Sequence, residues 1–392
     1  MGHPVNLSVA KILVVDDNPD NRDVLIRRLK RLELTNVAQA ADGIEALDAL
    51  RSGPFDLVLL DVMMPRMNGV EVLQAMRAEG RLEETPVVMI SAASEIDTVV
   101  RCIELGAEDY LPKPFNPALL AARVRAVLEK TFLRAENRSQ LARLERELAE
   151  ARVHQLSMVP TEFPVDPAVI DIHAIMEPAL EVGGDLYDVF AMDHGRLCVA
   201  VGDVAGKGTA AALFMARTRS LLRAGTLQFQ AIAQRAPLPS EIAALINDEL
   251  CKNNPHSTFV TLLIAFLDTA SGEVTYCNAG HGYPVLVRGA DVSEVANAPS
   301  PALGAFEDIA FVDHTLRMEI GDSLLLMSDG LADMHNRAAE SFGTERVLSE
   351  LALAAGRPAA ELIHQIVSAG FRFADGAPQF DDVTVLALSR VG

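Results

Sequence analysis

The first third of the chain alternates short apolar runs with amphipathic stretches, and this alternation constrains the fold more than any other feature. Five short, mainly apolar runs are each followed by a stretch with helical periodicity. The pairs are residues 12–15 with 20–32, 37–40 with 44–50, 57–60 with 70–76, 87–90 with 95–105, and 109–111 with 117–128. Strands that alternate with helices in this way predict an α/β domain with a five-stranded, doubly wound parallel sheet.

Polar residues follow several of these predicted strands. Asp16 and Asp17 come after the first strand and Asp61 after the third. In such sheets ligands bind beyond the carboxyl ends of the strands, so three carboxylates should meet there. Close like charges are costly unless a cation neutralises them, and oxygen ligands favour a hard ion such as Mg²⁺. Ser91 and Lys113 end the fourth and fifth strands at the same edge, where a hydroxyl and an ammonium can bind a phosphoryl group.

Residues from about 10 to 128 resemble the receiver domain of two-component response regulators. Asp61 stands in Leu-Leu-Asp-Val-Met-Met-Pro, and Lys113 precedes a proline. The resemblance implies a flavodoxin-like fold and makes Asp61 the phospho-acceptor. Asp61 would attack a phosphohistidine or a small phosphodonor while Mg²⁺ and Lys113 offset the charge on the phosphoryl oxygens. The implied partner is a sensor histidine kinase or a phosphotransfer protein. The alternative is a flavodoxin-like domain with chance carboxylates in its loops.

The resemblance also assigns the remaining residues of this pocket. It implies that Asp16 and Asp17 hold one Mg²⁺ together with Asp61. It further implies that Ser91 and the aromatic residue Tyr110 reorient when Asp61 is phosphorylated.

A segment without Gly or Pro, residues 129–155, joins the two halves of the chain. It is rich in Arg, Glu, Leu and Ala, as expected of a long exposed helix. Residues at alternating intervals of four and three form a heptad seam: Asn137, Leu141, Leu144, Leu148 and Ala151. This pattern predicts a coiled coil and a parallel homodimer. The alternative is a single amphipathic helix packed on a neighbouring domain.

The last two thirds of the chain show longer strand candidates and fewer helices. Strands are predicted at residues 170–176, 197–201, 259–267, 273–278, 284–288, 323–327 and 383–388, and helices at 209–223, 240–251, 344–355 and 359–371. This pattern predicts an α+β domain of mostly antiparallel sheets with flanking helices.

Aspartates recur in this half where predicted strands give way to turns. They are Asp185 in Val-Gly-Gly-Asp, Asp203 in Gly-Asp-Val-Ala-Gly-Lys-Gly, Asp329 in Ser-Asp-Gly, and the pair Asp381 and Asp382. Gly beside Asp lets the backbone turn sharply and leaves room for a hydrated cation. The stretch 202–209 is not a phosphate-binding loop, because Val201 and Gly208 occupy the positions that the P-loop pattern reserves for Gly and for Ser or Thr.

In this order the motifs resemble PP2C-type serine/threonine phosphatases of the SpoIIE/RsbU-like branch, from about residue 158 to 389. The resemblance includes residues 156–160, Phe259-Val-Thr, Asn278-Ala-Gly-His and Pro301-Ala-Leu-Gly. It implies a sandwich fold that binds two Mn²⁺ or Mg²⁺ ions. The implied ligands are Asp203, which bridges both ions, the carbonyl of Val204, Asp329 and Asp381 at one ion, and Asp185 at the other.

The sequence leaves two alternative roles for each of three residues near these motifs. Asp188 and Asp382 flank the expected ligands and either support them from behind or lie on the surface. His281 is either a general acid or a residue that orients its loop by hydrogen bonding. Asp333 stands where family members often carry Glu, and an Arg that would grip the substrate phosphate is not evident near the first motif.

The net charge and the cysteines limit which other partners and which cellular compartment are expected. A formal net charge of -20 disfavours nucleic acid and anionic membranes, whose binding needs basic patches. The four cysteines are scattered singly, which indicates neither a disulfide framework nor a zinc site and suits the cytoplasm. Neither an export signal nor a membrane anchor is evident.

Together these features predict four segments: an N-terminal tail at 1–8, a receiver domain at 9–128, a helical linker at 129–157 and a phosphatase domain at 158–392. The predicted function is a response regulator in which phosphorylation of Asp61 controls a metal-dependent phosphoserine/phosphothreonine phosphatase. By family resemblance its substrate is a phosphorylated STAS-domain anti-sigma factor antagonist. The alternative is a non-catalytic adaptor that binds a protein of a sigma-factor pathway under receiver control.

Overall fold

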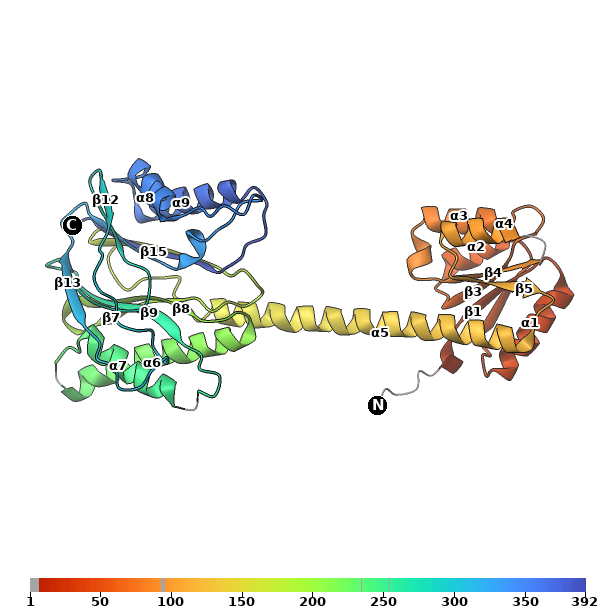
Figure 1. The fold of residues 1–392 in the computed structure, drawn as a ribbon, viewed down its shortest axis with the longest axis horizontal. Coiled ribbons are helices and arrows are strands. Elements are labelled where there is room, and N and C mark those ends of the chain that lie inside the picture. The colour runs from red at the N-terminus through yellow and green to blue at the C-terminus, as the bar shows by residue number, and fades with distance from the viewer. Residues whose placement is uncertain (1–6, 93–95, 234, 253) are drawn as a thin grey trace. The chain divides into compact units, whose positions relative to one another are not determined.

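The computed structural model describes residues 7–92, 96–233, 235–252 and 254–392. Residues 1–6 of the predicted tail and Glu95, the predicted start of a helix, lie outside this range. The chain divides into two compact units that meet between Leu144 and Glu145, within one helix (Figure 1). No helix in the described part of the chain is long and apolar enough to cross a membrane.

The N-terminal unit is built on a parallel sheet of order β2-β1-β3-β4-β5. After the short 3-10 helix η1 (Leu7–Val9), its elements are β1 (Ile12–Val15), α1 (Pro19–Arg31), β2 (Val37–Ala40), α2 (Gly43–Ser52), β3 (Leu57–Asp61), α3 (Gly69–Ala78), η2 (Arg81–Glu83), β4 (Val87–Ala92), α4 (Ile96–Leu105), β5 (Asp109–Lys113) and α5 (Pro117–Leu156). The predicted doubly wound α/β fold is confirmed.

Apolar side chains cover both faces of this sheet. One core joins it to α2, α3 and α4, and the other joins it to α1 and the first part of α5. The strands β1 and β3 are buried at every residue, which is why they appear in the sequence as continuous apolar runs rather than alternating ones. The central strands of the sheet are therefore covered on both faces, whereas the edge strands β2 and β5 are only partly buried.

The predicted helix end at residue 128 was wrong. Helix α5 continues without a break from Pro117 to Leu156, so the last helix of the N-terminal unit and the linker are one helix. The change near residue 129 is one of burial: Val124 and Leu128 are buried, whereas Leu141 and Leu144 are more than half exposed. The amino-acid composition changes near residue 129 because the helix no longer packs against the sheet there. The helix itself continues, since this stretch has no Gly or Pro that would break it.

The C-terminal unit is a sandwich of two antiparallel sheets, with strand orders β13-β10-β9-β8-β7 and β12-β11-β14-β15-β6. Its elements are β6 (Ile170–Glu177), β7 (Leu186–Met192), η3 (Asp193–Gly195), β8 (Arg196–Val204), α6 (Thr209–Ala233), α7 (Pro239–Cys251), β9 (Val260–Asp268), β10 (Glu273–Ala279), β11 (Val285–Arg288), β12 (Asp291–Glu294), β13 (Asp313–Arg317), β14 (Ser323–Met327), η4 (Asp329–Leu331), α8 (Thr344–Leu353), α9 (Ala359–Ala374) and β15 (Val383–Arg390). The predicted α+β class is confirmed.

Three apolar cores give this unit its layers. The inner faces of the two sheets form the central core, α6 and α7 cover the outer face of the first sheet, and α8 and α9 cover the second (Figure 1). Because the sheets pack face to face, the ends of β7 and β8 in one sheet come near the ends of β14 and β15 in the other. The aspartates of the C-terminal motifs lie at these ends.

Candidate active sites

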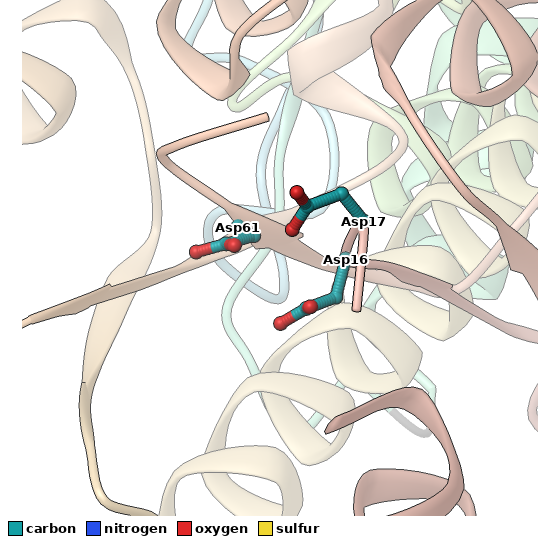
Figure 2. A group of neighbouring side chains, drawn as sticks. All are labelled: Asp16, Asp17 and Asp61. Atoms are coloured by element: carbon teal, nitrogen blue, oxygen red, sulfur yellow. The ribbon is translucent and has the colours of Figure 1, made fainter. Parts of the chain in front are cut away.

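The first acidic cluster lies at the carboxyl end of the parallel sheet. Asp61 is the last residue of β3, and Asp16 and Asp17 follow β1 directly (Figure 2). One oxygen from each of the three carboxylates lies within 4.8 Å of the other two. Asp16 and Asp61 are buried, whereas Asp17 is exposed. Three carboxylates at this spacing fit one hard divalent cation that is reached from the side of Asp17.

A lysine from β5 closes the cluster. The Nζ atom of Lys113 lies 2.9 Å from Oδ2 of Asp16 and 2.8 Å from Oδ2 of Asp61. Burial nevertheless raises the pKa of Asp61 to about 6, against the opposing effect of Lys113. The ionised form of Asp61 is therefore stabilised by any further positive charge in the pocket. A bound cation would supply that charge, and phosphoryl transfer to Asp61 requires the ionised form.

The other predicted residues of this pocket lie on the neighbouring strands. Ser91 is buried in β4, one residue beyond the partner of Asp61 in the strand register. Tyr110 lies on β5 and is 41% exposed, so its ring is free to change position without breaking a core. The sequence did not indicate Asn21, whose side-chain amide donates to both carboxylate oxygens of Asp16 at 3.1 and 3.2 Å.

The second acidic cluster lies at the ends of four strands of the sandwich. Asp185 immediately precedes β7, and Asp203 is the next-to-last residue of β8, its antiparallel neighbour. Asp329 follows β14 and Asp381 precedes β15, in the opposite sheet. Two strand pairs from facing sheets therefore bring together carboxylates that are almost 200 residues apart in the chain.

Burial and mutual repulsion both act on these carboxylates. The pKa of Asp203 is raised to about 7, first by burial and then by the charges of Asp329 and Asp381. The pKa of Asp329 is raised by burial and by the charges of Asp333 and Asp381. The pKa of Asp185 is raised well above its ordinary value, mainly by burial. Each of these shifts reports a negative charge that lacks compensation.

Asp185 shows most clearly what the cluster lacks. It is 2% exposed, and both of its carboxylate oxygens are buried without a hydrogen-bond partner in the described part of the chain. Buried polar atoms are rarely left unpaired, so such a group calls for an unseen water or ion. Unlike in the first cluster, no three of these carboxylates have oxygens that all lie within 4.8 Å of one another in the described part of the chain. The residues present therefore fit a pair of divalent cations.

The carbonyl of Val204 faces the same region. A Cβ atom at Gly184 would lie 2.9 Å from the Val204 oxygen. This places the carbonyl against the loop of Asp185, where the resemblance assigns it to a cation.

Asp382 supports the loop of Asp185 from behind. Its Oδ1 accepts from the backbone N–H of Ala179 at 2.8 Å, and its Oδ2 accepts from that of Gly184 at 2.6 Å. A Cβ atom at Gly183 would lie only 2.2 Å from Oδ2, so the close approach of the two segments requires glycine at this position. Since its oxygens are engaged in this way, Asp382 holds the loop in place.

Asp188 contacts arginine side chains of a helix, a contact that the sequence did not predict. It is fully buried, so the surface alternative is wrong. Its carboxylate pairs with Arg223 at 2.6 Å and with Arg219 at 3.2 Å, both on α6. Asp188 therefore fastens α6 to β7, and a buried carboxylate of this kind is stable because it is paired.

His281 lies in the interior beside β9. Its Nδ1 is 2.9 Å from the hydroxyl of Thr261, and its backbone N–H donates to Asn278 at 2.7 Å. Burial lowers the pKa of His281 to about 4, so the ring is neutral near pH 7. The Thr261 hydroxyl in turn lies 3.4 Å from the backbone oxygen of Asp203. This geometry favours the loop-orienting role that the sequence left open.

Lys207 was missed as a site residue, since its place in a turn suggested only contact with solvent. Its Nζ lies 3.2 Å from Oδ2 of Asp381 and 3.9 Å from the centroid of the Phe380 ring, and it donates to the Phe380 carbonyl. Its charge also lowers the pKa of Asp329, against the larger effect of burial. These partners are more than 170 residues away in sequence, so the residues around Lys207 could not predict the contact.

Comparisons with known proteins agree with this division. The model of the family described as Stage II sporulation protein E (SpoIIE) matches residues 193–391, and that of the response regulator receiver domain matches residues 12–125. The SpoIIE range contains Asp203, Asp329 and Asp381, and Asp185 lies just before it. The fold and the two acidic sites thus define a receiver domain joined to a PP2C-like domain.

Individual relatives support the same conclusion. Protein IcfG of Synechocystis sp. is 28% identical over 281 residues, 67% of this chain and 44% of IcfG. The transcriptional regulatory protein CpxR of Escherichia coli is 48% identical over 122 residues, 31% of this chain and 50% of CpxR. The chain therefore spans half or less of the length of these relatives.

Among solved structures, the SiaA-PP2C domain of Pseudomonas aeruginosa matches with a TM-score of 0.56 and 19% identity, over 64% of this chain and 98% of that domain. This match shows a shared fold. Since the SpoIIE model covers half of the sequence, the chain belongs to the SpoIIE family, with a receiver domain at its N-terminus.

Proposed function

We propose that this protein is a response regulator in which phosphorylation of Asp61 controls a metal-dependent phosphoserine/phosphothreonine phosphatase. The observation that carries the proposal is the second acidic cluster, in which Asp185 is buried without a partner and the pKa of Asp203 is raised to about 7. Such a cluster is costly by itself and is stabilised by divalent cations.

In the proposed reaction, the carboxylates of Asp185, Asp203, Asp329 and Asp381 and the carbonyl of Val204 hold two Mn²⁺ or Mg²⁺ ions. When bound, the ions would lower the pKa of water and offset the charge on the phosphoryl oxygens. The chain itself provides the fixed positions of these ligands at rigid strand ends. His281 is neutral and buried, so we assign it to holding the β8 end in place rather than to proton transfer.

In the receiver domain, the ionised Asp61 carboxylate accepts the phosphoryl group. Asp16 and Asp17 would hold one Mg²⁺ with it, and Lys113 on β5 contacts Oδ2 of Asp16 and Oδ2 of Asp61. Ser91 and Tyr110 are the residues that we expect to change position afterwards. We propose a sensor histidine kinase or a phosphotransfer protein as the donor.

The proposed substrate is a phosphorylated STAS-domain anti-sigma factor antagonist, which would place the protein in partner-switching control of transcription. We also propose that two chains pair in parallel through α5. Leu133, Leu141 and Leu144 on this helix are 50%, 60% and 54% exposed, and a second copy would cover Leu141 and Leu144 in the heptad seam. The proposed domain limits remain 9–128, 129–157 and 158–392.

The test is the release of phosphate by the full-length protein from a serine-phosphorylated STAS-domain protein and from p-nitrophenyl phosphate. We expect release that requires Mn²⁺ or Mg²⁺ and that is lost in Asp329→Ala. Circular dichroism of the variant checks that it is folded. If the folded wild-type protein releases no phosphate from either substrate with either metal, the proposal is wrong, and the protein is better explained as an adaptor.

A further inference from the structure

The last turn of α5 touches the loop that carries Asp185. Gln155 lies at this end of the helix and is 4% exposed, although α5 is largely exposed between residues 133 and 150. Its Nε2 donates to the carbonyl of Gly183 at 2.6 Å, and its Oε1 accepts from the N–H of the same residue at 3.0 Å. Both functions of one side-chain amide are therefore used on one peptide segment, two residues before Asp185.

The same short loop is held from its other side by Asp382. The two contacts are independent, because Gln155 binds the backbone of Gly183 and Asp382 binds the backbone N–H groups of Ala179 and Gly184. The loop is therefore fixed between a residue of the linker helix and a residue next to Asp381, itself a proposed metal ligand.

These contacts bear on Asp185 because they fix the backbone from which its side chain projects. Both oxygens lack a hydrogen-bond partner in the described structure, so the direction of the side chain depends on the backbone that precedes it. Groups that orient a metal ligand affect metal affinity nearly as strongly as some ligands do. Arg152, also on α5, donates to the carbonyl of Leu180 in this loop at 3.2 Å, but of the two α5 residues only Gln155 binds a residue within two positions of Asp185.

We infer that Gln155 is a positioning residue for Asp185 and that it ties the metal affinity of the phosphatase site to the last turn of α5. The inference rests on the proposed function and deepens it. Hydrogen bonds of 2.6 and 3.0 Å are lost when the atoms separate by much less than the rise of one helical residue, about 1.5 Å. A small shift or rotation of the helix end is therefore enough to release the loop.

The test uses the full chain with Asp17→Asn, which removes an exposed ligand of the receiver's own cation. Mn²⁺ binding is measured from the electron paramagnetic resonance signal of the free ion. Gln155→Leu removes both hydrogen bonds at similar volume, and Gln155→Glu removes only the donor. Gln140→Leu is the matched control, since Gln140 lies on the same helix and is exposed. We expect Gln155→Leu to weaken Mn²⁺ binding about ten- to hundredfold and Gln140→Leu to leave it unchanged.

A second readout follows from the reciprocity of coupling. If the helix end influences the metal site, Mn²⁺ must also stabilise the helix end. Amide hydrogen exchange at residues 152–157 and 183–185 should slow when Mn²⁺ is added, and the slowing at 152–157 should disappear in both Gln155 variants.

The outcomes separate the two claims. If Asp203→Asn does not reduce Mn²⁺ binding, the metal site and hence the proposed function fail, and the inference fails with them. If Asp203→Asn abolishes binding but both Gln155 variants, folded by circular dichroism, bind Mn²⁺ and exchange amides like the parent, the role of Gln155 alone is refuted.

Discussion

The two acidic sites of this chain both bring several carboxylates together, but they differ in how much of the negative charge the protein itself compensates. In the receiver pocket, Lys113 contacts both Asp16 and Asp61, so part of the charge is compensated by the protein itself. In the second acidic site, Lys207 pairs with Asp381, and within the described ranges the other three proposed ligand carboxylates, Asp185, Asp203 and Asp329, form no ion pair. The first site is therefore partly compensated without a cation, whereas the second is the one that, under the proposed function, depends on added cations.

This difference fits the two proposed chemistries. A receiver must accept and then lose a phosphoryl group, and a permanent lysine can contact either state of the aspartate. Hydrolysis by two ions needs carboxylates that are free to bind them, so a strong internal ion pair would compete. The predictions that follow test this contrast, from the largest expected effect to the smallest.

The largest effect should come from removing the carboxylate that both ions are proposed to share. We expect Asp203→Asn to lower metal-dependent phosphate release at least about a thousandfold, since the charge stabilisation by bound ions is worth several kcal/mol. Phosphorylation of Asp61 by a small phosphodonor should remain unchanged. Steady-state rates and a phosphate-affinity gel measure the two activities. Equal loss of both would mean that the sites are not separate.

Removal of the internal cation should damage the receiver domain. Lys113→Met removes the cation from two buried carboxylates, of which Asp16 keeps its hydrogen bonds from Asn21. We expect a loss of roughly 3–5 kcal/mol in the free energy of unfolding of that domain. Saturating Mg²⁺ should recover part of this loss. Urea unfolding followed by circular dichroism, with and without Mg²⁺, measures the effect. A wild-type unfolding curve for this variant in EDTA would contradict the view that Lys113 compensates the pocket.

The buried histidine should make the C-terminal domain sensitive to acid. The pKa of His281 is lowered from 6.5 to about 4, so the unfolded chain takes up the proton first and stability falls as the pH drops from 6.5 to 4. This amounts to about 3 kcal/mol, which His281→Gln should remove. The measurement is the difference in unfolding free energy between wild type and variant at pH 7 and pH 4. His154→Gln, at an exposed position, is the control; a constant difference across this range would refute the assignment.

The smallest effect should come from the lysine of the second site. Lys207 and Asp381 are both about one-third exposed, so their ion pair is worth less than about 1 kcal/mol. We expect Lys207→Met to tighten Mn²⁺ binding slightly, by no more than about fivefold, because a competing cation is removed. Calorimetric titration with Mn²⁺ measures this. A large loss of affinity would show that Lys207 organises the site, and the contrast with Lys113 would then be wrong.

Much of the fold could be predicted because burial leaves a clear local pattern. The three central receiver strands are continuous apolar runs, and the predicted starts of all five strands coincide with the observed ones. The missed strands lacked this signal: β12 and β13 are polar strands at the sheet edges, and β7 contains Asp188, whose arginine partners lie on α6. Helix α6 was predicted to end at Arg223 but continues to Ala233 through Gly225, which lies close to Leu245 of α7.

The candidate sites were predictable in their carboxylates but not in their supports. Asp61, Asp203 and Asp329 stand in recognisable local motifs, and strand ends must gather on one edge of a sheet. The contacts of Lys207 with Asp381 and of Gln155 with Gly183 depend on how distant segments pack. A lone Lys or Gln carries no periodicity or motif that would reveal such a partner.

The central claim is that the state of Asp61 sets the rate at the second acidic site. The most direct test measures metal-dependent phosphate release from a serine-phosphorylated STAS-domain protein, with and without a small phosphodonor, by the wild type and by Asp61→Asn. We predict a rate that changes severalfold with the donor in the wild type and not at all in Asp61→Asn. An active wild-type enzyme with equal rates in both states, although Asp61 is shown to be phosphorylated, would contradict the account.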